Sequence, residues 1–195
     1  MTIKKGQPWG APAPRPADLI LADGDAELAE LVTRDAGGAF GIRGGDLHRS
    51  LGAPSQRDET QLLTVDALRV RVDDREMLAV AHVVARHGWW RGPLLAVLNC
   101  AYVGDWNVAP RAHPNDGHFD VVEVSEKMSL RQRLQARRRL PLGNHLPHPQ
   151  IGVRTGESTV WVFDAPRDIY VDGVRRGRAT RLAIAIAPDH FSIHI

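Results

Sequence analysis

Cysteine is almost absent from this chain of 195 residues, because Cys100 is the only one. A single cysteine excludes an intrachain disulfide framework and a zinc site built from several cysteines, so we expect a reducing, cytoplasmic setting. Long apolar runs are also missing: no stretch reaches the roughly 18 residues that a membrane-spanning helix needs. The residues after Met1 form no apolar segment, so we expect no secretory signal.

Lysine is scarce as well. Lys4, Lys5 and Lys127 are the only lysines among 25 basic residues, and the others are arginines. Since 23 residues are acidic, the formal net charge is only +2, which is too small to indicate a nucleic-acid-binding protein. We therefore expect no nucleic-acid partner. Hydrophobic residues make up 43% of the chain and charged residues 25%, which is typical of a globular domain with a buried core.

Composition divides the chain into three parts. Residues 1–16 hold four prolines and no apolar period, which predicts a flexible tail. Residues 17–61 combine helical periodicity with glycine-rich turns, which predicts a small α/β unit. In residues 62–195 the period of the apolar positions changes from about 3.6 to about 2. We therefore expect an α+β fold, mostly β, in which the small unit precedes a larger β-rich domain.

The third part carries the pattern of a β-sandwich. Leu68, Val70 and Val72 alternate with charged residues, which is typical of a half-buried strand. Further strand signals occur at Met77–Ala85, Leu94–Ala101, Phe119–Val124, Thr159–Phe163, Asp168–Val171, Leu182–Ile186 and Phe191–Ile195. About eight strands in roughly 130 residues is the density of a sandwich or a barrel.

One helix is expected among these strands, over Ser129–Leu140. Ser129 and Gln132 have the spacing of a capping box. The apolar stripe of this helix, which includes Leu130 and Leu134, is thin and suited to packing on the sheet. Its arginines predict a solvated basic face. They leave open a second interpretation, in which the helix rests on an anionic membrane surface, so we expect at most a peripheral membrane contact.

Four segments within residues 62–195 together resemble one family. Ala109–Asp120 is similar to the signature "AP-x-A-x-x-x-DG-x-x-D", and Asn99 matches the asparagine upstream of it. Gly143–Pro149 resembles "G-K-H-x-x-H-P", and Tyr170–Gly173 stands where "x-x-DGE" is written. These motifs belong to the C-terminal domain of the diacylglycerol-kinase-like lipid kinases, whose fold is shared with NAD kinases. The resemblance implies a β-sandwich-like lipid-kinase domain.

The second part of the chain resembles the nucleotide-binding domain of the same family in eroded form. Asp23–Val32 aligns with "GGDGT-L-N-E-V-V", and Gly44–Gly52 with the end of "GT-x-ND-F-A-R-S-L-G". The resemblance implies that Gly24 and Asp25 are nucleotide-binding positions and that Asp46 is an acidic residue beside the catalytic cleft. The "NP-x-SG" phosphate loop of the family has no counterpart. We therefore interpret this part as a remnant of the nucleotide-binding domain.

Two acidic residues distinguish the first of these motifs from the family pattern. Asp23 replaces a glycine and Glu27 replaces the threonine, where the resemblance implies nucleotide phosphates. Two negative charges about 4 Å apart repel by about 4 kcal/mol at an effective dielectric of about 20, which equals the binding free energy of a millimolar ligand. We therefore expect no ATP binding in the manner of the family. Alternatively, Asp23 and Asp25 simply cap a helix.

The position of the family's general base is also altered. The resemblance implies that the glutamate of "DGE" accepts the proton of the lipid hydroxyl, and here Val174 occupies that position. An isopropyl group accepts no proton, and general-base assistance is typically worth about 10² to 10⁴ in rate. Asp46 remains the candidate catalytic residue if the protein is active.

Two functions therefore stay open. In the first, the protein is a catalytically degenerate relative that binds a lipid, another apolar ligand or a protein partner. In the second, it is an active ATP-dependent lipid kinase, and another chain or a homo-oligomer supplies the missing ATP-binding half. Apolar surface exposed by the missing half favours a dimer in either case.

A structural Mg²⁺ is a further implication of the resemblance. Asp116 would bind the ion through water, and the backbone carbonyl groups of His113 and His118 would complete the site. Hard oxygen ligands and retained waters suit Mg²⁺. The alternative is that Asp116 and Gly117 only form a turn between two strands.

Overall fold

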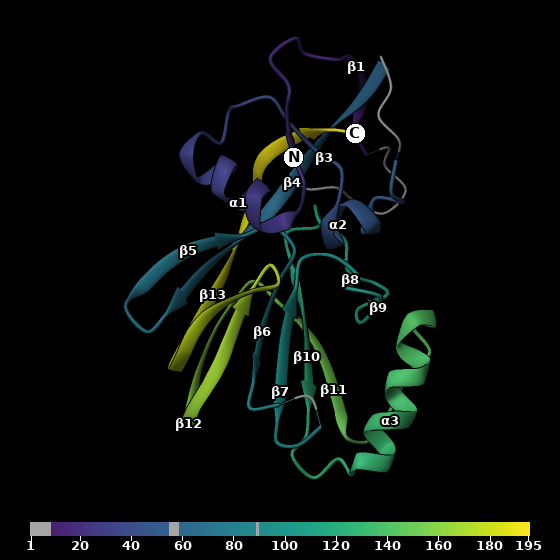
Figure 1. The fold of residues 1–195 in the computed structure, drawn as a ribbon, viewed down its shortest axis with the longest axis vertical. Coiled ribbons are helices and arrows are strands. Elements are labelled where there is room, and N and C mark those ends of the chain that lie inside the picture. Colours follow the sequence, from purple (N-terminus) through teal and green to yellow (C-terminus); the bar gives the residue numbers. More distant parts are fainter. Residues whose placement is uncertain (1–8, 55–58, 89) are drawn as a thin grey trace.

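The computed structural model describes residues 9–54, 59–88 and 90–195, and Figure 1 shows how their elements are arranged. The helices are α1 (Asp25–Arg34), α2 (Gly45–Ser50), α3 (Leu130–Arg139) and a 3₁₀ turn, η1 (Leu140–Leu142). The strands are β1 (Ala11–Pro14), β2 (Ile20–Ala22), β3 (Phe40–Ile42), β4 (Glu59–Val72), β5 (Arg75–Ala79), β6 (His82–Arg86), β7 (Leu94–Leu98), β8 (Tyr102–Val103), β9 (Trp106–Asn107), β10 (Phe119–Val124), β11 (Ile151–Gly156), β12 (Ser158–Val171) and β13 (Val174–His194).

Hydrogen bonds join eleven strands of the described residues into one sheet. Its order is β1-β4-β13-β12-β6-β7-β10-β11; β5 pairs with β4, and β2 and β3 pair beside the end of β13. Strands β8 and β9 form a separate hairpin. The pairs of the larger part are antiparallel, and Figure 1 shows this part as layers of strands with α3 on one side. The expected mostly β fold is confirmed.

The main core lies where the sheet closes over itself. Alternate side chains of β4 and β13 face those of β6, β7 and β10, as the period of two predicts. The core includes Leu68 and Val70 from β4, Val83 from β6, Val121 from β10 and Leu182 from β13. These side chains are at most 2% exposed. Their burial gives the sandwich its two-layered form.

The same strands are also covered on their second face. Val84, Ala96 and Val122 point away from the main core and form another buried cluster with Leu98 and Val108. The polypeptide around β8 and β9 and the end of α3 cover this cluster. Because β7 is buried on both faces, its sequence is a continuous apolar run, and the middle residues of β6 and β10 are apolar as well.

A smaller core joins the front of the chain to the sandwich. Leu28 and Val32 of α1, Phe40 of β3 and Leu47 of α2 pack together with Ile193 near the end of β13. Strand β3 pairs in parallel with this end of β13. Strand β4 also contributes to both cores, so the expected boundary between residues 61 and 62 falls inside a strand.

The structure corrects the expected flexible tail at some of its positions. Within residues 1–16, Ala11–Pro14 pair with β4 as the edge strand β1, while residues 1–8 lie outside the described part. Proline is tolerated on an edge strand, since its missing N–H faces away from the partner. Trp9 adds an anchor, because its Nε1 donates to the carbonyl oxygen of Thr64 at 2.9 Å.

Two pairs of expected strands are merged. Strand β12 covers both expected strands between residues 158 and 171, with a shift of register between Val162 and Arg167. Strand β13 covers the last two, with a shift between Ala187 and Phe191. A bulge keeps the chain extended where the alternation breaks, so the sequence pattern indicated two strands where one continues.

Helix α3 confirms its predicted cap and differs in its buried side. Ser129 Oγ accepts from the backbone N–H of Gln132, and the Gln132 side chain accepts from the backbone N–H of Ser129. Leu130 and Leu134, expected on the sheet, are 53% and 43% exposed. Arg133 is buried instead, because its guanidinium group donates to nearby backbone carbonyl oxygens. No helix of the described residues has the length and apolar character needed to cross a membrane.

The capping box gives a test of the fold. Replacing Ser129→Ala removes one partner of the N-terminal N–H groups of α3, and we expect the free energy of unfolding to fall by about 1 kcal/mol. Urea unfolding measures this change. Ser158→Ala, at an exposed position in β12, is the matched control, and an equal loss in both variants would contradict the assignment of the cap.

Candidate functional site

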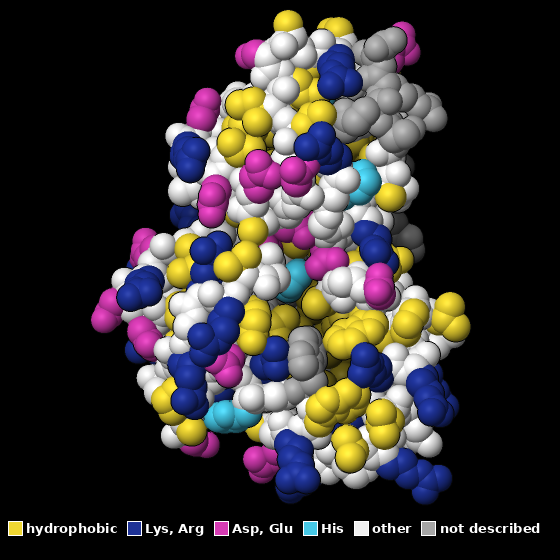
Figure 2. Space-filling view, viewed as in Figure 1, with side chains coloured by type: hydrophobic (Ala, Val, Ile, Leu, Met, Phe, Trp, Pro, Cys, Tyr) yellow, Lys and Arg dark blue, Asp and Glu magenta, His cyan; other side chains and the backbone are white. Residues whose placement is uncertain are grey.

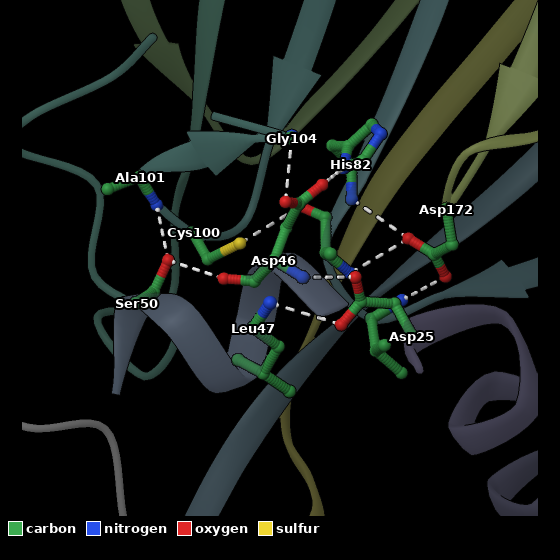
Figure 3. Close-up of polar contacts among 11 residues, drawn as sticks. Asp25, Asp46, Leu47, Ser50, His82, Cys100, Ala101, Gly104 and Asp172 are labelled. Carbon is green, nitrogen blue, oxygen red and sulfur yellow. Dashed lines mark hydrogen bonds and ion pairs between the residues drawn. The ribbon is translucent and has the colours of Figure 1, made fainter. Parts of the chain in front are cut away.

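Asp25 is a nucleotide-binding position by resemblance. Its carboxylate binds the N-terminus of α2, although Asp25 itself belongs to α1. It is the first residue of α1, whose N-cap is Gly24 and has no side-chain cap. Its carboxylate accepts instead from the backbone N–H groups of Asp46 and Leu47 at the start of α2 (Figure 3). The expectation that Asp25 caps its own helix is therefore wrong, because the turn before α2 brings a second set of unpaired N–H groups within reach.

Glycine is required where α2 meets this carboxylate. Gly45 has a φ of +91°, in the region that side chains other than glycine rarely adopt. A Cβ atom at this position would lie 2.6 Å from the carboxyl atoms of Asp25. The close approach of α1 and α2 thus depends on Gly45.

Burial dominates the electrostatics of Asp25. It raises the pKa of this carboxyl group to about 7, and the charge of Asp172 adds to the shift, while the two N–H groups from α2 oppose it. Asp23 behaves differently, because it is exposed and paired with Arg43, whose hydrogen bond lowers the pKa of Asp23. This pairing with Arg43 reduces the repulsion that Asp23 would exert on a phosphate group.

Asp46 joins α2 to the strands of the sandwich. One carboxylate oxygen, Oδ1, accepts from the backbone N–H of Gly104 at 2.8 Å. The other, Oδ2, lies 3.3 Å from Nδ1 of His82. Burial lowers the pKa of His82, although the carboxylates of Asp46 and Asp25 oppose the shift. The half-buried carboxylate and the buried imidazole thus lie within ion-pair distance of each other, without a completed hydrogen bond.

Asp172 fixes the backbone on the far side of this pair. Its carboxylate accepts from the N–H groups of Val80, Ala81 and His82, each at 2.9 Å. Burial raises the pKa of Asp172 to about 6, and these three hydrogen bonds oppose the shift. Asp172 therefore positions His82 by binding its backbone. Val174, two residues later, is 41% exposed at the start of β13.

Asn99 and Cys100 hold the neighbouring turn after β7. The Nδ2 atom of Asn99 donates to the carbonyl oxygens of Asp66 and Val80, at 2.8 and 2.9 Å. Cys100 is fully buried, and burial raises the pKa of its thiol, which keeps it protonated and unreactive. Asn99, singled out by the resemblance, thus supports the turn through Nδ2, while its Oδ1 atom is buried without a hydrogen-bond partner among the described residues.

The structure brings part of the expected site together. Asp25, Asp46 and Asp172 converge around His82 (Figure 3), and Gly24 precedes Asp25 as the N-cap residue of α1. His82 was missed by sequence reasoning, because a single histidine at the start of an apolar strand gives no signal of its role. The residues of the expected Mg²⁺ site lie in another segment, the turn before β10.

That turn is held by a buried acid. Asp66 of β4 accepts from the backbone N–H groups of Gly117 and Asp189, at 2.8 and 2.7 Å. Asp116 Oδ1 accepts from the backbone N–H of His118 at 3.0 Å. Burial, reinforced by the charge of Asp116, raises the pKa of Asp120 to about 6. Negative charge therefore gathers at the start of β10.

The side chains that commonly bind metal ions form no cluster in the described part of the chain. Within residues 9–54, 59–88 and 90–195, no group of three or more His, Cys, Asp and Glu side chains has the geometry to hold a metal ion. An ion at the turn before β10 would be held by the Asp116 carboxylate through water and by the backbone carbonyl oxygens of His113 and His118. This donor set is all oxygen, which fits Mg²⁺.

An apolar cavity of about 290 Å³ lies between the second face of the sandwich and α3. Val84, Ala96 and Val122 line it from the large sheet, Trp106 from β9 and Trp90 from the segment between β6 and β7. Figure 2 shows hydrophobic side chains gathered on this face, beside the basic side chains of the α3 region. We call this space the α3 cavity.

The α3 cavity adjoins the polar cluster through one turn. Val103 and Trp106 line the cavity, and Gly104, between them in the chain, donates to Asp46. The Asp46 carboxylate is thus linked directly to the hairpin that forms part of the cavity wall.

The raised pKa of Asp25 predicts a pH dependence of stability. In the unfolded chain its pKa is about 3.9, so the folded state holds the proton more tightly. The contribution of this group is fully present below about pH 4 and is lost as the pH rises through about 7.

We therefore expect Asp25→Asn to reduce the loss of unfolding free energy between about pH 4 and about pH 8. Urea unfolding over this range measures the difference from the unchanged protein. Asp74→Asn, at an exposed position, is the control. A pH profile of Asp25→Asn that is parallel to that of the unchanged protein would show that Asp25 is not the buried acid described above.

Comparisons with known proteins agree with this fold. The family model of the YegS C-terminal NAD kinase beta sandwich-like domain matches residues 58–194. Two solved structures of proteins assigned as diacylglycerol kinases from Bacillus anthracis str. Sterne are similar over 90% of this chain. One has a TM-score of 0.67, 14% identity and 77% of its own length covered; the other has 0.66, 16% and 75%.

No curated protein matches the chain in a sequence search. The two structural similarities, at low identity, bear on the fold alone. The family model, in contrast, spans most of the chain and includes the motifs at Asn99, Asp116, His145 and Asp172. The chain therefore belongs to the family of the YegS C-terminal NAD kinase beta sandwich-like domain.

Proposed function

We propose that this protein binds a lipid or another apolar small molecule in the α3 cavity and, by itself, transfers no phosphoryl group. The observation that carries the proposal is the apolar lining of the cavity, to which β6, β7 and β10 contribute their second face. A concave site with few polar groups is typical of pockets for small apolar ligands.

Arg133, one of the two arginines in the lining, is engaged by backbone carbonyl oxygens. Arg133 uses Nε to donate to the carbonyl oxygen of Met128 at 3.2 Å and an Nη atom to donate to that of Ser125 at 3.1 Å. Its charge therefore serves the packing of α3. Ala136 and Leu140, on the same helix, present apolar groups to the cavity.

The size of the cavity supports a useful affinity. A volume of about 290 Å³ has room for about ten groups the size of a water molecule. Burial of about ten methylene groups contributes roughly 8 kcal/mol, the free energy of a micromolar complex before the costs of association are subtracted.

Two features support the absence of phosphoryl transfer by this chain alone. The N–H groups of Asp46 and Leu47, which an anion at the start of α2 would use, already bind the Asp25 carboxylate. Val174 stands at the position of the proton acceptor by resemblance, and its side chain has no basic atom.

A second candidate function has one observation in its favour. The Asp46 carboxylate, next to the imidazole of His82, binds the turn between Val103 and Trp106, which both line the α3 cavity. A hydroxyl group at the edge of the cavity could deliver its proton to this pair. In this alternative, the protein is a lipid kinase whose ATP-binding half comes from another chain or a second copy.

Ligand titration tests the first proposal. We expect monooctanoylglycerol to bind the delipidated protein, as measured by calorimetry. Ala136→Phe should weaken this binding by about tenfold or more, because the ring occupies space that the ligand needs. Gln135→Phe, on the exposed side of α3, is the matched control. Absence of binding, together with absence of co-purified lipid in native mass spectrometry, would overturn the proposal.

A phosphorylation assay separates the two candidate functions. We expect the purified chain to convert no Mg-ATP and monooctanoylglycerol into a phosphorylated lipid and to show no sub-millimolar affinity for Mg-ATP in calorimetry. Turnover by the chain alone would contradict the first proposal. Turnover that appears only after a second protein is added, and disappears in Asp46→Asn, would favour the alternative.

We also propose that Mg²⁺ binds the turn before β10. Bound metal would neutralise the negative charge of Asp116 that helps to raise the pKa of Asp120. We therefore expect millimolar Mg²⁺ to raise the Tm of the unchanged protein and not that of Asp116→Asn. Asp74→Asn again serves as the control, and an equal rise in both variants would argue against this site.

A further inference from the structure

His145 is a buried polar side chain without a hydrogen-bond partner. Only 3% of it is exposed, and it lines the α3 cavity. Both ring nitrogens are buried, and neither makes a hydrogen bond within the described residues. The carbonyl group of Val108 lies close to the ring without completing such a bond. Buried groups of this kind are rare in native proteins and call for an explanation.

The surroundings of His145 favour the neutral imidazole. Burial lowers its pKa, and the side chains Val84, Ala96 and Ile151 of the same lining are apolar. A neutral imidazole has one N–H donor and one acceptor nitrogen. It can therefore bind a hydroxyl group as donor or acceptor, or a carbonyl group as donor.

A charged partner fits this position poorly. A carboxylate or ammonium group next to His145 would lose its hydration without gaining an opposite charge, because the Arg133 guanidinium group is engaged by backbone carbonyl oxygens. Arg137 also lines the cavity, but it is exposed, and its guanidinium group lies 5.0 Å from the centre of the Trp90 ring. Charged groups of a ligand would stay beside this exposed side chain.

The volume of the α3 cavity limits how many alkyl or acyl chains a bound ligand can have. About 290 Å³ corresponds to about ten water-sized groups, which is enough for one alkyl or acyl chain of medium length. A second chain of the same length would need about twice this space.

We propose that the α3 cavity takes a single alkyl or acyl chain carrying an uncharged hydroxyl or carbonyl group, and that His145 binds this group by a hydrogen bond. The inference rests on the proposed function, since it concerns the ligand of the same cavity. It specifies the ligand class and the residue that recognises its polar group.

A pair of matched probes tests the role of His145. The probes 1-decanol and n-undecane have the same number of heavy atoms, and only the alcohol forms hydrogen bonds. We expect His145→Phe to weaken binding of 1-decanol by about tenfold, the effect of one buried hydrogen bond, and to leave binding of n-undecane unchanged or stronger. His87→Phe, at an exposed histidine outside the cavity, is the control. Calorimetry with both probes delivered from cyclodextrin gives the affinities.

Nitrogen-15 NMR of the unchanged protein tests the same contact without a substitution. We expect the ring nitrogens of His145 to shift on addition of 1-decanol and to stay nearly constant with n-undecane. This measurement remains decisive if His145→Phe fails to fold. Equal changes in affinity for both probes, or ring resonances that respond equally to both, would overturn the role of His145.

A two-chain probe tests the limit on ligand size. We expect dioctanoylglycerol to bind no more tightly than monooctanoylglycerol, and a clearly tighter complex would overturn the single-chain part. These results are distinct from a failure of the proposed function, in which no apolar probe binds at all.

Discussion

Burial of β6, β7 and β10 on both faces is the constraint on which the rest of this structure depends. One face closes the sandwich core and the other needs a cover. The cover consists of the segment around β8 and β9 and of α3, and it leaves a cavity rather than a fully packed layer. A sheet with one solvated face would need no such cover. The proposed ligand site is thus a consequence of how the strands are buried.

The polar cluster follows from the way the front unit is attached. Carboxylates of three segments, Asp25, Asp46 and Asp172, each bind backbone N–H groups of a different segment. Such contacts neutralise free ends of helices and turns, and they hold α1, α2 and the β5–β6 turn around His82. Asp25, which the family resemblance connects with nucleotide binding, therefore also links α1 to α2 in this structure.

Sequence reasoning predicted the features that depend on local pattern. The capping box at Ser129 and the strand Phe119–Val124 agree with the structure, because both depend on residues close in the chain. The contact of Asp25 with α2 and the position of His82 could not be predicted, since they depend on how distant turns approach one another. The burial of Arg133 in place of Leu130 could not be predicted either, since one of its acceptors is the carbonyl oxygen of Gly92, which is distant in the sequence.

Strand β13 is 21 residues long and connects the sandwich to the front unit. It runs beside β12 and β4 in the sandwich, and then pairs with β3 of the front unit. The backbone hydrogen bonds of β13 therefore extend through both cores. If one core unfolds, the strand loses part of these hydrogen bonds in the other core as well. The molecule should behave as one cooperative unit in amide exchange. A ligand that stabilises the sandwich should therefore also slow amide exchange in the front unit.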